Sequence, residues 1–306
     1  MAFAAFGHSG SASPKSKAPT KTGKVALLLL LPGLLYLGLF FLTPLISLII
    51  TSLEVPDISG EIGRYQYGFA IENYASVMQS YLPHILRSFT YAIVATIFAL
   101  LISYPLAYFI AIRARRFPLI QGLLLTLVIA PFFISFLLRT IAWKQIFSDE
   151  SWIVQGLQGL GVLAPDQYLV GSDFMVIFGL IYNFIPFMTL PLYTTLERLD
   201  LRYLEASADL YASPVTTFRK ITLPLTMPGI ISGTLLTFIP IAGDYVNASR
   251  DFLGSTETAM IGNVVEANYL QINDYPAASA LSVILMFAIL VLVGIYVKRS
   301  GTEDLL

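Results

Sequence analysis

Residues able to make or break covalent bonds are scarce in this sequence. It contains no cysteine and only two histidines, His8 and His84, which excludes thiolate nucleophiles, disulfides and a histidine-rich metal cluster. No Gly-x-x-x-x-Gly-Lys-Ser/Thr phosphate loop, His-Glu-x-x-His helix or Gly-x-Ser-x-Gly elbow occurs. We therefore expect a protein that is not an enzyme and that binds no metal or cofactor itself.

The chemistry that remains is recognition of a charged solute. Asp244 follows the uncharged residues 221–243, and a carboxylate at the end of such a run is costly unless it meets water, a cation or a donor. Asp244 would pair with an ammonium group of a cationic solute, and the aromatic face of Tyr245 would cover the methylene groups of that solute. The alternative is that Asp244 is an ordinary acidic residue at a helix end. Asn183 and Tyr182 are weaker candidates, because an intramembrane Asn more often bonds a neighbouring helix.

Long uncharged stretches must position these residues. The sequence is 56% hydrophobic and 12% charged, whereas soluble domains contain about 25% charged residues. A helix needs about 20 apolar residues to cross a bilayer. We therefore predict an all-α polytopic membrane protein with six transmembrane helices. The six stretches without a charge are Val25–Leu53, Ser88–Ile112, Phe117–Leu138, Phe174–Leu196, Ile221–Gly243 and Tyr275–Val297.

The two ends differ from the central part in composition. Residues 1–24 are rich in Ser, Ala, Lys and Pro and are predicted to be a disordered cytoplasmic tail. The first apolar stretch is longer than the roughly 7–15 residues of a signal-peptide core, so we expect a retained helix. Residues 25–299 are expected to form one six-helix membrane domain, followed by a cytoplasmic tail at 300–306.

The distribution of charge gives the orientation. With the N-terminus inside, 13 of the 18 Lys and Arg residues lie on the cytoplasmic side, where basic residues concentrate. Of the 19 Asp and Glu residues, 13 then lie outside. The sequence therefore predicts that both termini are cytoplasmic. Its net charge of -1 gives no support to a nucleic-acid partner.

One cytoplasmic loop, within residues 197–224, has room for structure. Glu205–Leu210 is rich in helix formers, Ser213 is a suitable N-cap and Pro214 takes the favoured first helical position. The sequence therefore predicts two short helices with a break between them. Such a pair either docks into a partner or lies on lipid headgroups. The mixed charge around Glu205, with Asp209 and Arg219 nearby, favours docking.

The same loop resembles the cytoplasmic signature of the permease subunits of bacterial ABC importers. That signature is Glu-Ala-Ala, three residues, Gly, nine residues, then Ile-x-Leu-Pro; this chain has Glu205-Ala206-Ser207, Tyr211 and Ile221-Thr222-Leu223-Pro224 at the same spacing. The resemblance implies a type I ABC importer permease fold in which this segment docks into a cleft of an ATPase subunit. The implied coupling residues are Glu205, Ala206, Ser207, Tyr211, Ser213, Pro214, Phe218, Leu223 and Pro224.

Tyr211 departs from the signature, which has glycine at this position. Glycine permits a turn with positive φ, which a bulky residue reaches at a cost of about 1–2 kcal/mol. Either the turn uses another geometry, or this subunit docks less tightly. A heterodimeric transporter would tolerate weak docking if the second permease kept the full signature.

Further stretches resemble the spermidine/putrescine-type permeases and imply import of a small cationic solute, a polyamine. Asp251–Ser255 departs from the Leu-Leu-Gly-Gly-like element that relatives usually have. Permeases for ferric iron, thiamine or a phosphonate, or a membrane scaffold or sensor that recruits a cytoplasmic partner, are the alternatives. The stretches are Ser103–Phe109, Ala130–Phe133, Arg139–Trp143, Phe238–Val246, Ala259–Asn263 and Asn273–Ala280.

The resemblance also implies the other components of the transporter. A dimer of ATPase subunits would bind ATP and Mg²⁺, so this chain would hold neither. A second permease subunit would complete a heterodimer, and an extracytoplasmic binding protein would deliver the solute. The implied location is the bacterial cytoplasmic (inner) membrane, where lipid surrounds the helices.

Overall fold

The computed structural model describes residues 22–59, 61–164 and 166–299. Helix α1 (Thr22–Leu37) begins three residues before the expected start of the first apolar stretch. The rest of the predicted N-terminal tail, and the C-terminal tail at 300–306, lie outside the described residues. The chain divides into two compact units, with the division between Ser47 and Leu48.

The described part of the first unit, from Thr22 onward, is helical throughout and mostly apolar. A π-helical turn, η1 (Gly38–Leu42), joins α1 to α2 (Thr43–Thr51), which runs into the second unit. The stretch Leu28–Thr51 has a mean hydropathy of 2.2 and no buried residue in its most apolar window. A helix that is apolar on every side is suited to lipid or to another membrane helix. This element matches the first predicted span.

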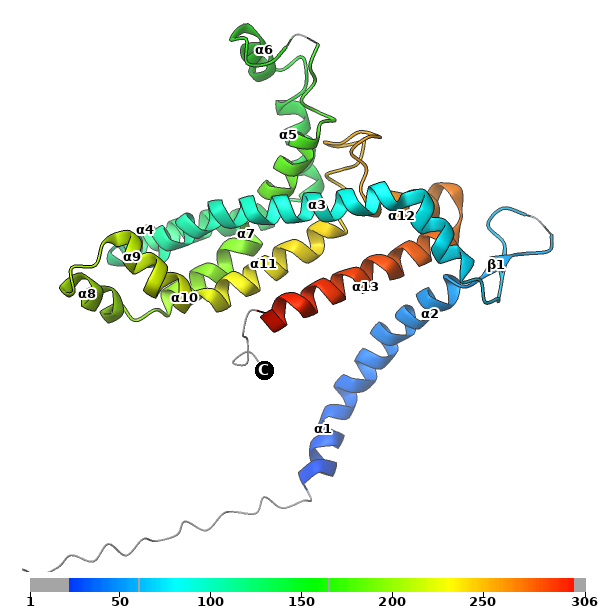
Figure 1. Ribbon diagram of the computed structural model, residues 1–306, viewed down its shortest axis with the longest axis horizontal. Coiled ribbons are helices and arrows are strands. Elements are labelled where there is room, and N and C mark those ends of the chain that lie inside the picture. Colours follow the sequence, from blue (N-terminus) through cyan, green and yellow to red (C-terminus); the bar gives the residue numbers. More distant parts are fainter. Residues whose placement is uncertain (1–21, 60, 165, 300–306) are drawn as a thin grey trace, which may run out of the picture. The chain divides into compact units, whose positions relative to one another are not determined.

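The second unit is built around a bundle in which α3, α7 and α11 pack against one another and α13 packs on α3 (Figure 1). Small residues of α3, including Ala92 and Ala95, are fully buried, which permits close helix approach. Gly229 and Gly233 of α11 face Thr195 and Met188 of α7 with no room for a Cβ. The bundle helices are α3 (Glu72–Tyr108), α7 (Asp173–Glu197), α11 (Met227–Ala242) and α13 (Tyr275–Arg299).

The third predicted span is not one straight helix. Helix α4 (Pro118–Ile129) continues into a 3-10 turn, η4 (Ala130–Phe133), and then meets α5 (Phe136–Ile146) at 95°. Pro131 in the turn cannot donate a backbone hydrogen bond and so interrupts the helical pattern. The third uncharged stretch, Phe117–Leu138, is therefore divided between α4 and the start of α5.

The fifth predicted span is also bent. The segment preceding α11 meets it at 67°, with the break at Thr226, whose φ of -100° and ψ of 4° are not helical. Pro224 and Pro228 flank this break. Four described helices are long and apolar enough to cross a membrane, and six spans result if each bent pair counts as one. The segment comprises α9 (Pro214–Thr217), η5 (Phe218–Thr222) and α10 (Leu223–Leu225).

The connections lie at the two ends of the bundle. Helix α8 (Arg202–Asp209) lies with α9 at one end, and α12 (Ile261–Ala267) lies at the other (Figure 1). Helices α5 and α6 (Trp152–Gly159) project away from the bundle (Figure 1). The remaining elements are β1 (Val55–Pro56), paired antiparallel with β2 (Tyr65–Gln66), and the helical turns η2 (Phe109–Arg113), η3 (Ala114–Arg116) and η6 (Asn268–Ile272).

Gly254 allows the loop after α11 to fold tightly on itself. A Cβ at this position would overlap the carbonyl group of Ala248 and lie 2.8 Å from Thr258 Oγ1. We expect Gly254→Ala to destabilise the fold by about 1–3 kcal/mol, since backbone must shift to relieve the overlap. Thermal unfolding in detergent would measure this. Gly156→Ala in α6, where no atom lies within 4 Å of the added Cβ, is the control and should leave the midpoint unchanged.

Candidate functional site

The two short cytoplasmic helices predicted from the sequence are present as α8 and α9. The backbone N–H of Thr216 donates to Ser213 Oγ at 3.3 Å, so Ser213 is the N-cap, and Pro214 takes the first helical position. The hydroxyl groups of Ser207 in α8 and Thr217 in α9 lie 2.9 Å apart. This side-chain hydrogen bond joins the two helices across the turn.

The turn between the helices centres on Tyr211. The N–H of Tyr211 donates to Ala208 O at 2.9 Å, and the N–H of Ala212 donates to Ser207 O at 3.0 Å. This pair of bonds is the Schellman pattern, which places a left-handed residue, usually glycine, just after the helix end. Tyr211 has a φ of 54°. The alternative of another turn geometry is therefore wrong, and the turn keeps the glycine conformation at a cost of about 1–2 kcal/mol.

Phe218 connects the helix pair to the bundle. Its ring meets the Tyr104 ring of α3 edge-on, with centroids 5.4 Å apart, and Tyr104 Oη lies 2.8 Å from Thr226 Oγ1. Leu223 packs against the buried cluster formed by α3 and α7, whereas Pro224 is exposed beside the break in the fifth span. Through these contacts a displacement of α8 and α9 would reach α3 directly.

We expect Phe218→Ala to weaken this connection, because an edge-to-face aromatic pair contributes about 0.5–1.5 kcal/mol beyond its buried area. If the helix pair couples this chain to an ATPase, as the resemblance implies, the amount of solute carried per ATP hydrolysed by the reconstituted assembly should fall severalfold. Phe174→Ala, which removes an exposed ring at the start of α7, is the matched control. An unchanged transport-to-hydrolysis ratio in Phe218→Ala would show that the ring pair transmits no movement.

The outward surface of the helix pair is available to a partner. Glu205, Ala206, Ser213 and Pro214 are exposed, whereas Ser207 is buried beneath them. Within the described ranges the one ion pair joins Arg64 and Glu61, so the Glu205 carboxylate has no basic partner there. This arrangement suits an intermolecular contact.

Asp244 lies in a buried polar network at the end of α11. The carboxyl group is 7% exposed, and both of its oxygens accept hydrogen bonds from Asn247, one from the backbone N–H at 2.8 Å and one from Nδ2 at 3.1 Å. Burial raises the pKa of Asp244, which lies beyond the helix end, to about 6. Asn183 of α7 donates through Nδ2 to Asn247 Oδ1 at 3.0 Å and to Thr140 Oγ1 at 3.3 Å. Asn247 thus links the two candidates.

Tyr182 and Tyr245 lie outside this network. The ring of half-buried Tyr182 meets Trp143 of α5 edge-on, with centroids 5.0 Å apart. Tyr245 is 50% exposed, and its backbone carbonyl accepts from the Asn263 side chain. The structure therefore brings Asp244 and Asn183 together, while the two tyrosines lie apart from them in contacts of their own.

Two residues of this region were missed by sequence reasoning. Asn247 has a weak signal, since an Asp that hydrogen-bonds a backbone N–H a few residues later is a common local motif. Arg139 is 9% exposed, and its Nε and Nη1 atoms have no hydrogen-bond partner in the described part of the chain. Its guanidinium carbon lies 5.8 Å from the centre of the Phe136 ring. Only the fold reveals that this arginine is buried.

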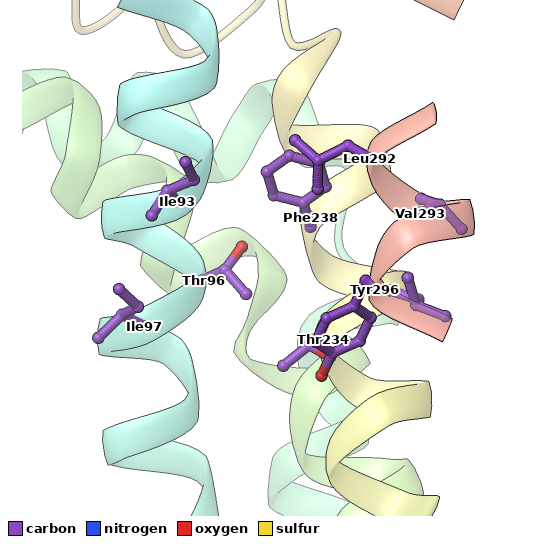
Figure 2. A pocket seen from close by; sticks show the side chains of 9 residues that line it. Ile93, Thr96, Ile97, Thr234, Phe238, Leu292, Val293 and Tyr296 are labelled. Carbon is purple, nitrogen blue, oxygen red and sulfur yellow. The ribbon is translucent and has the colours of Figure 1, made fainter. Parts of the chain in front are cut away.

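The cavities of the bundle differ in chemistry. One, of about 260 Å³, lies between α3, α11 and α13 and is lined almost entirely by apolar side chains, including Ile93, Phe238 and Leu292 (Figure 2). It offers no carboxylate to a cation. A cleft of about 420 Å³ beside α12 is instead lined by charged residues of both signs, Arg250 together with Asp251 and Glu266. Of these two cavities, the cleft beside α12 is the one that offers carboxylates.

The family, the related sequences and the solved structure that match this chain are all components of transport systems. Residues 103–299 match the family described as binding-protein-dependent transport system inner membrane component. The chain is 33% identical over 282 residues to the spermidine/putrescine transport system permease protein PotB of Escherichia coli strain K12, covering 92% of this chain and 95% of that protein. The PotB protein of Salmonella typhimurium strain LT2 is likewise 33% identical, covering 92% and 91%.

A solved structure shows the same fold at lower identity. It belongs to a bacterial ABC transporter involved in the import of the acidic polysaccharide alginate. The TM-score is 0.67 at 18% identity, with 92% of this chain and 97% of that chain covered. At this identity the likeness concerns the arrangement of helices and not the solute.

Proposed function

The chain belongs to the family of binding-protein-dependent transport system inner membrane components, and we propose that it is one permease subunit of an ATP-driven polyamine importer. It is a transport permease with the type I ABC importer fold, as predicted. The observation that carries the choice of solute is the 33% identity to the spermidine/putrescine permease over 92% of this chain. None of the relatives reported above favours ferric iron, thiamine, a phosphonate or a scaffold role.

In this proposal the energy comes from a dimer of ATPase subunits that binds ATP and Mg²⁺. Closure of that dimer moves α8 and α9 as a rigid body, and the contact of Phe218 with Tyr104 transmits the movement to α3. The path across the membrane then opens alternately to each side. The end of α3, followed by Arg113, Arg115 and Arg116, lies at the same end of the bundle as α8 and α9 (Figure 1). This placement supports a cytoplasmic location for both.

The solute would enter at the opposite end. An extracytoplasmic binding protein delivers the polyamine, and the carboxylates of Asp251 and Glu266 attract its ammonium groups to the cleft beside α12. Asp244 and Asn183, with the aromatic faces of Tyr245 and Tyr182, are the proposed contacts further along the path. A second permease subunit forms the other wall, which makes the transporter a heterodimer in the inner membrane.

Reconstitution of the whole assembly tests the proposal. Proteoliposomes containing this chain, the second permease, the ATPase and the binding protein should accumulate radiolabelled spermidine or putrescine only when ATP is supplied on the ATPase side. An excess of unlabelled polyamine should compete, whereas thiamine should not. ATP hydrolysis with uptake of another solute alone would refute the polyamine part, and failure to bind an ATPase would refute the importer.

A further inference from the structure

Tyr211 combines backbone strain with almost complete exposure. Its φ is 54°, and the only other non-glycine residue with positive φ in the described ranges is Asn273. Asn reaches this conformation through local hydrogen bonds of its short polar side chain, an option that an aromatic residue lacks. The Tyr211 side chain is 97% exposed. The strained backbone therefore holds the ring in solvent.

Contacts within the chain do not offset this strain. In the part of the chain that the structure describes, neither a hydrogen bond nor a ring contact joins the Tyr211 side chain to another residue. The Schellman turn would form with glycine at no steric cost. Strain that persists without internal compensation is typical of positions that act on a partner or ligand.

The surroundings of Tyr211 are apolar and also exposed. Leu210 is 81% exposed and Val215, in the first turn of α9, is 66% exposed. We call these three residues the turn patch. It lies between α8 and α9, at the end of the bundle opposite α12 (Figure 1). Exposed apolar side chains on a tight turn are suited to insertion into a cavity of another molecule.

The charge of α8 favours a protein over the lipid surface as that molecule. Glu205 and Asp209 are four residues apart and thus share one face of α8, and both are exposed. The cytoplasmic leaflet carries a negative potential that attracts basic segments and repels acidic ones. Helix α8 also carries exposed Arg202, so its charge is mixed and it presents no basic face to lipid headgroups. In the importer proposed above, the protein that this turn meets is the ATPase subunit.

We propose that Tyr211 is a specificity-determining anchor whose ring enters an apolar pocket of the ATPase, so that this permease selects an ATPase having such a pocket. The inference rests on the proposed function, because the ATPase is taken as the partner. The left-handed backbone directs the ring out of the turn, and a buried aromatic anchor supplies a large share of binding energy at many interfaces. Where the family signature has glycine, this contact does not exist.

Affinity measurements on turn variants test the anchor. The permease pair, held in nanodiscs, is titrated with the purified ATPase subunit. Tyr211→Gly and Tyr211→Asn remove the ring, yet both residues adopt positive φ readily. We expect a Kd at least about tenfold higher for each, whereas Tyr211→Phe should stay within about twofold of wild type. Thermal unfolding of the glycine variant should be unchanged or shifted upward, which separates loss of the anchor from loss of the fold.

A second ATPase tests selectivity. It is taken from an importer whose permeases carry glycine at this position. The wild-type permease should bind this second ATPase with a Kd about tenfold or more above the Kd for its own ATPase. Tyr211→Gly should make the two Kd values more similar. Equal Kd values for wild type, Tyr211→Gly and Tyr211→Asn would overturn the proposal. The ring would then be assigned to the lipid headgroup layer and not to the ATPase. If the ATPase does not bind wild type at all, the proposed function itself fails.

Discussion

Glu205→Lys is expected to lower ATP-driven uptake at least tenfold while the transporter still assembles. Glu205 is exposed on α8 and has no basic partner in the described part of the chain, so its carboxylate is available to a basic or donor group of the ATPase. Reversing the charge replaces attraction by repulsion, and juxtaposed like charges at an interface cost several kcal/mol. A tenfold loss requires only about 1.4 kcal/mol. Uptake and ATP hydrolysis are measured together in proteoliposomes.

The helix itself provides the control for this result. Asp209 is exposed on the same helix, one turn after Glu205, and lies outside the matching part of the family signature. Asp209→Lys makes the same charge change at a position that the signature leaves unspecified, so it should reduce uptake less than Glu205→Lys does. Normal uptake in Glu205→Lys would remove Glu205 from the coupling contact. A Glu205→Gln variant, which keeps a hydrogen-bonding side chain, should lie between wild type and Glu205→Lys.

Asp244→Asn is expected to reduce uptake per assembled transporter at least tenfold and also to weaken the fold. Both carboxylate oxygens accept from Asn247, so an amide places one of its own donors against a donor of Asn247. A buried donor left without an acceptor costs about 1–3 kcal/mol. The loss of negative charge removes the proposed partner of the polyamine ammonium group. Uptake is normalised to the amount of folded complex, and the unfolding midpoint is measured separately.

The pH dependence distinguishes the two roles of Asp244. Its pKa of about 6 in the folded protein lies above the value of about 3.9 in an unfolded chain. The stability that this group contributes is therefore fully present at low pH and is lost as the pH rises through about 6, so acid does not weaken the fold through Asp244. Protonation nevertheless removes the charge. Uptake should fall as the pH drops from 7.5 to 5 in wild type, and the fall should be smaller in Asp244→Asn.

A matched variant completes the test. Asp251→Asn changes an exposed carboxylate of the outer cleft that is absent from the buried network. It should leave the unfolding midpoint unchanged and affect uptake mainly at low ionic strength, where long-range attraction of cations is strongest. If Asp244→Asn lowers the midpoint yet transports normally per folded complex, Asp244 is structural and does not contact the solute.

The positions of the spans and of the α8–α9 pair could be predicted because they depend on local patterns. Six uncharged stretches of membrane length correspond to the four straight spans and the two bent pairs. Ser213 and Pro214 begin α9 as capping preferences require. The angles of the two bends could not be predicted although prolines are visible near both, because proline is tolerated in many transmembrane helices and the packing of neighbours decides the angle.

The residues of the candidate solute site could be predicted only in part from the sequence. Asp244 and Asn183 stand out as polar groups near or within apolar stretches, which the sequence displays directly. Their connection through Asn247 joins positions 64 residues apart in the chain, and no local pattern encodes such a contact. The burial of Arg139 likewise depends on how α5 folds back after the 95° bend.

The sequence by itself determined that this chain is a helical membrane protein with a pair of short helices between its fourth and fifth spans, because hydropathy and helix capping act over short distances. It also showed that Tyr211 replaces a glycine. Only the tertiary structure decided that Tyr211 keeps the glycine conformation, since two backbone hydrogen bonds from Tyr211 and Ala212 to α8 impose the turn. The hydrogen bond between Ser207 and Thr217 then joins α8 to α9 across this turn, a contact that neither helix specifies alone.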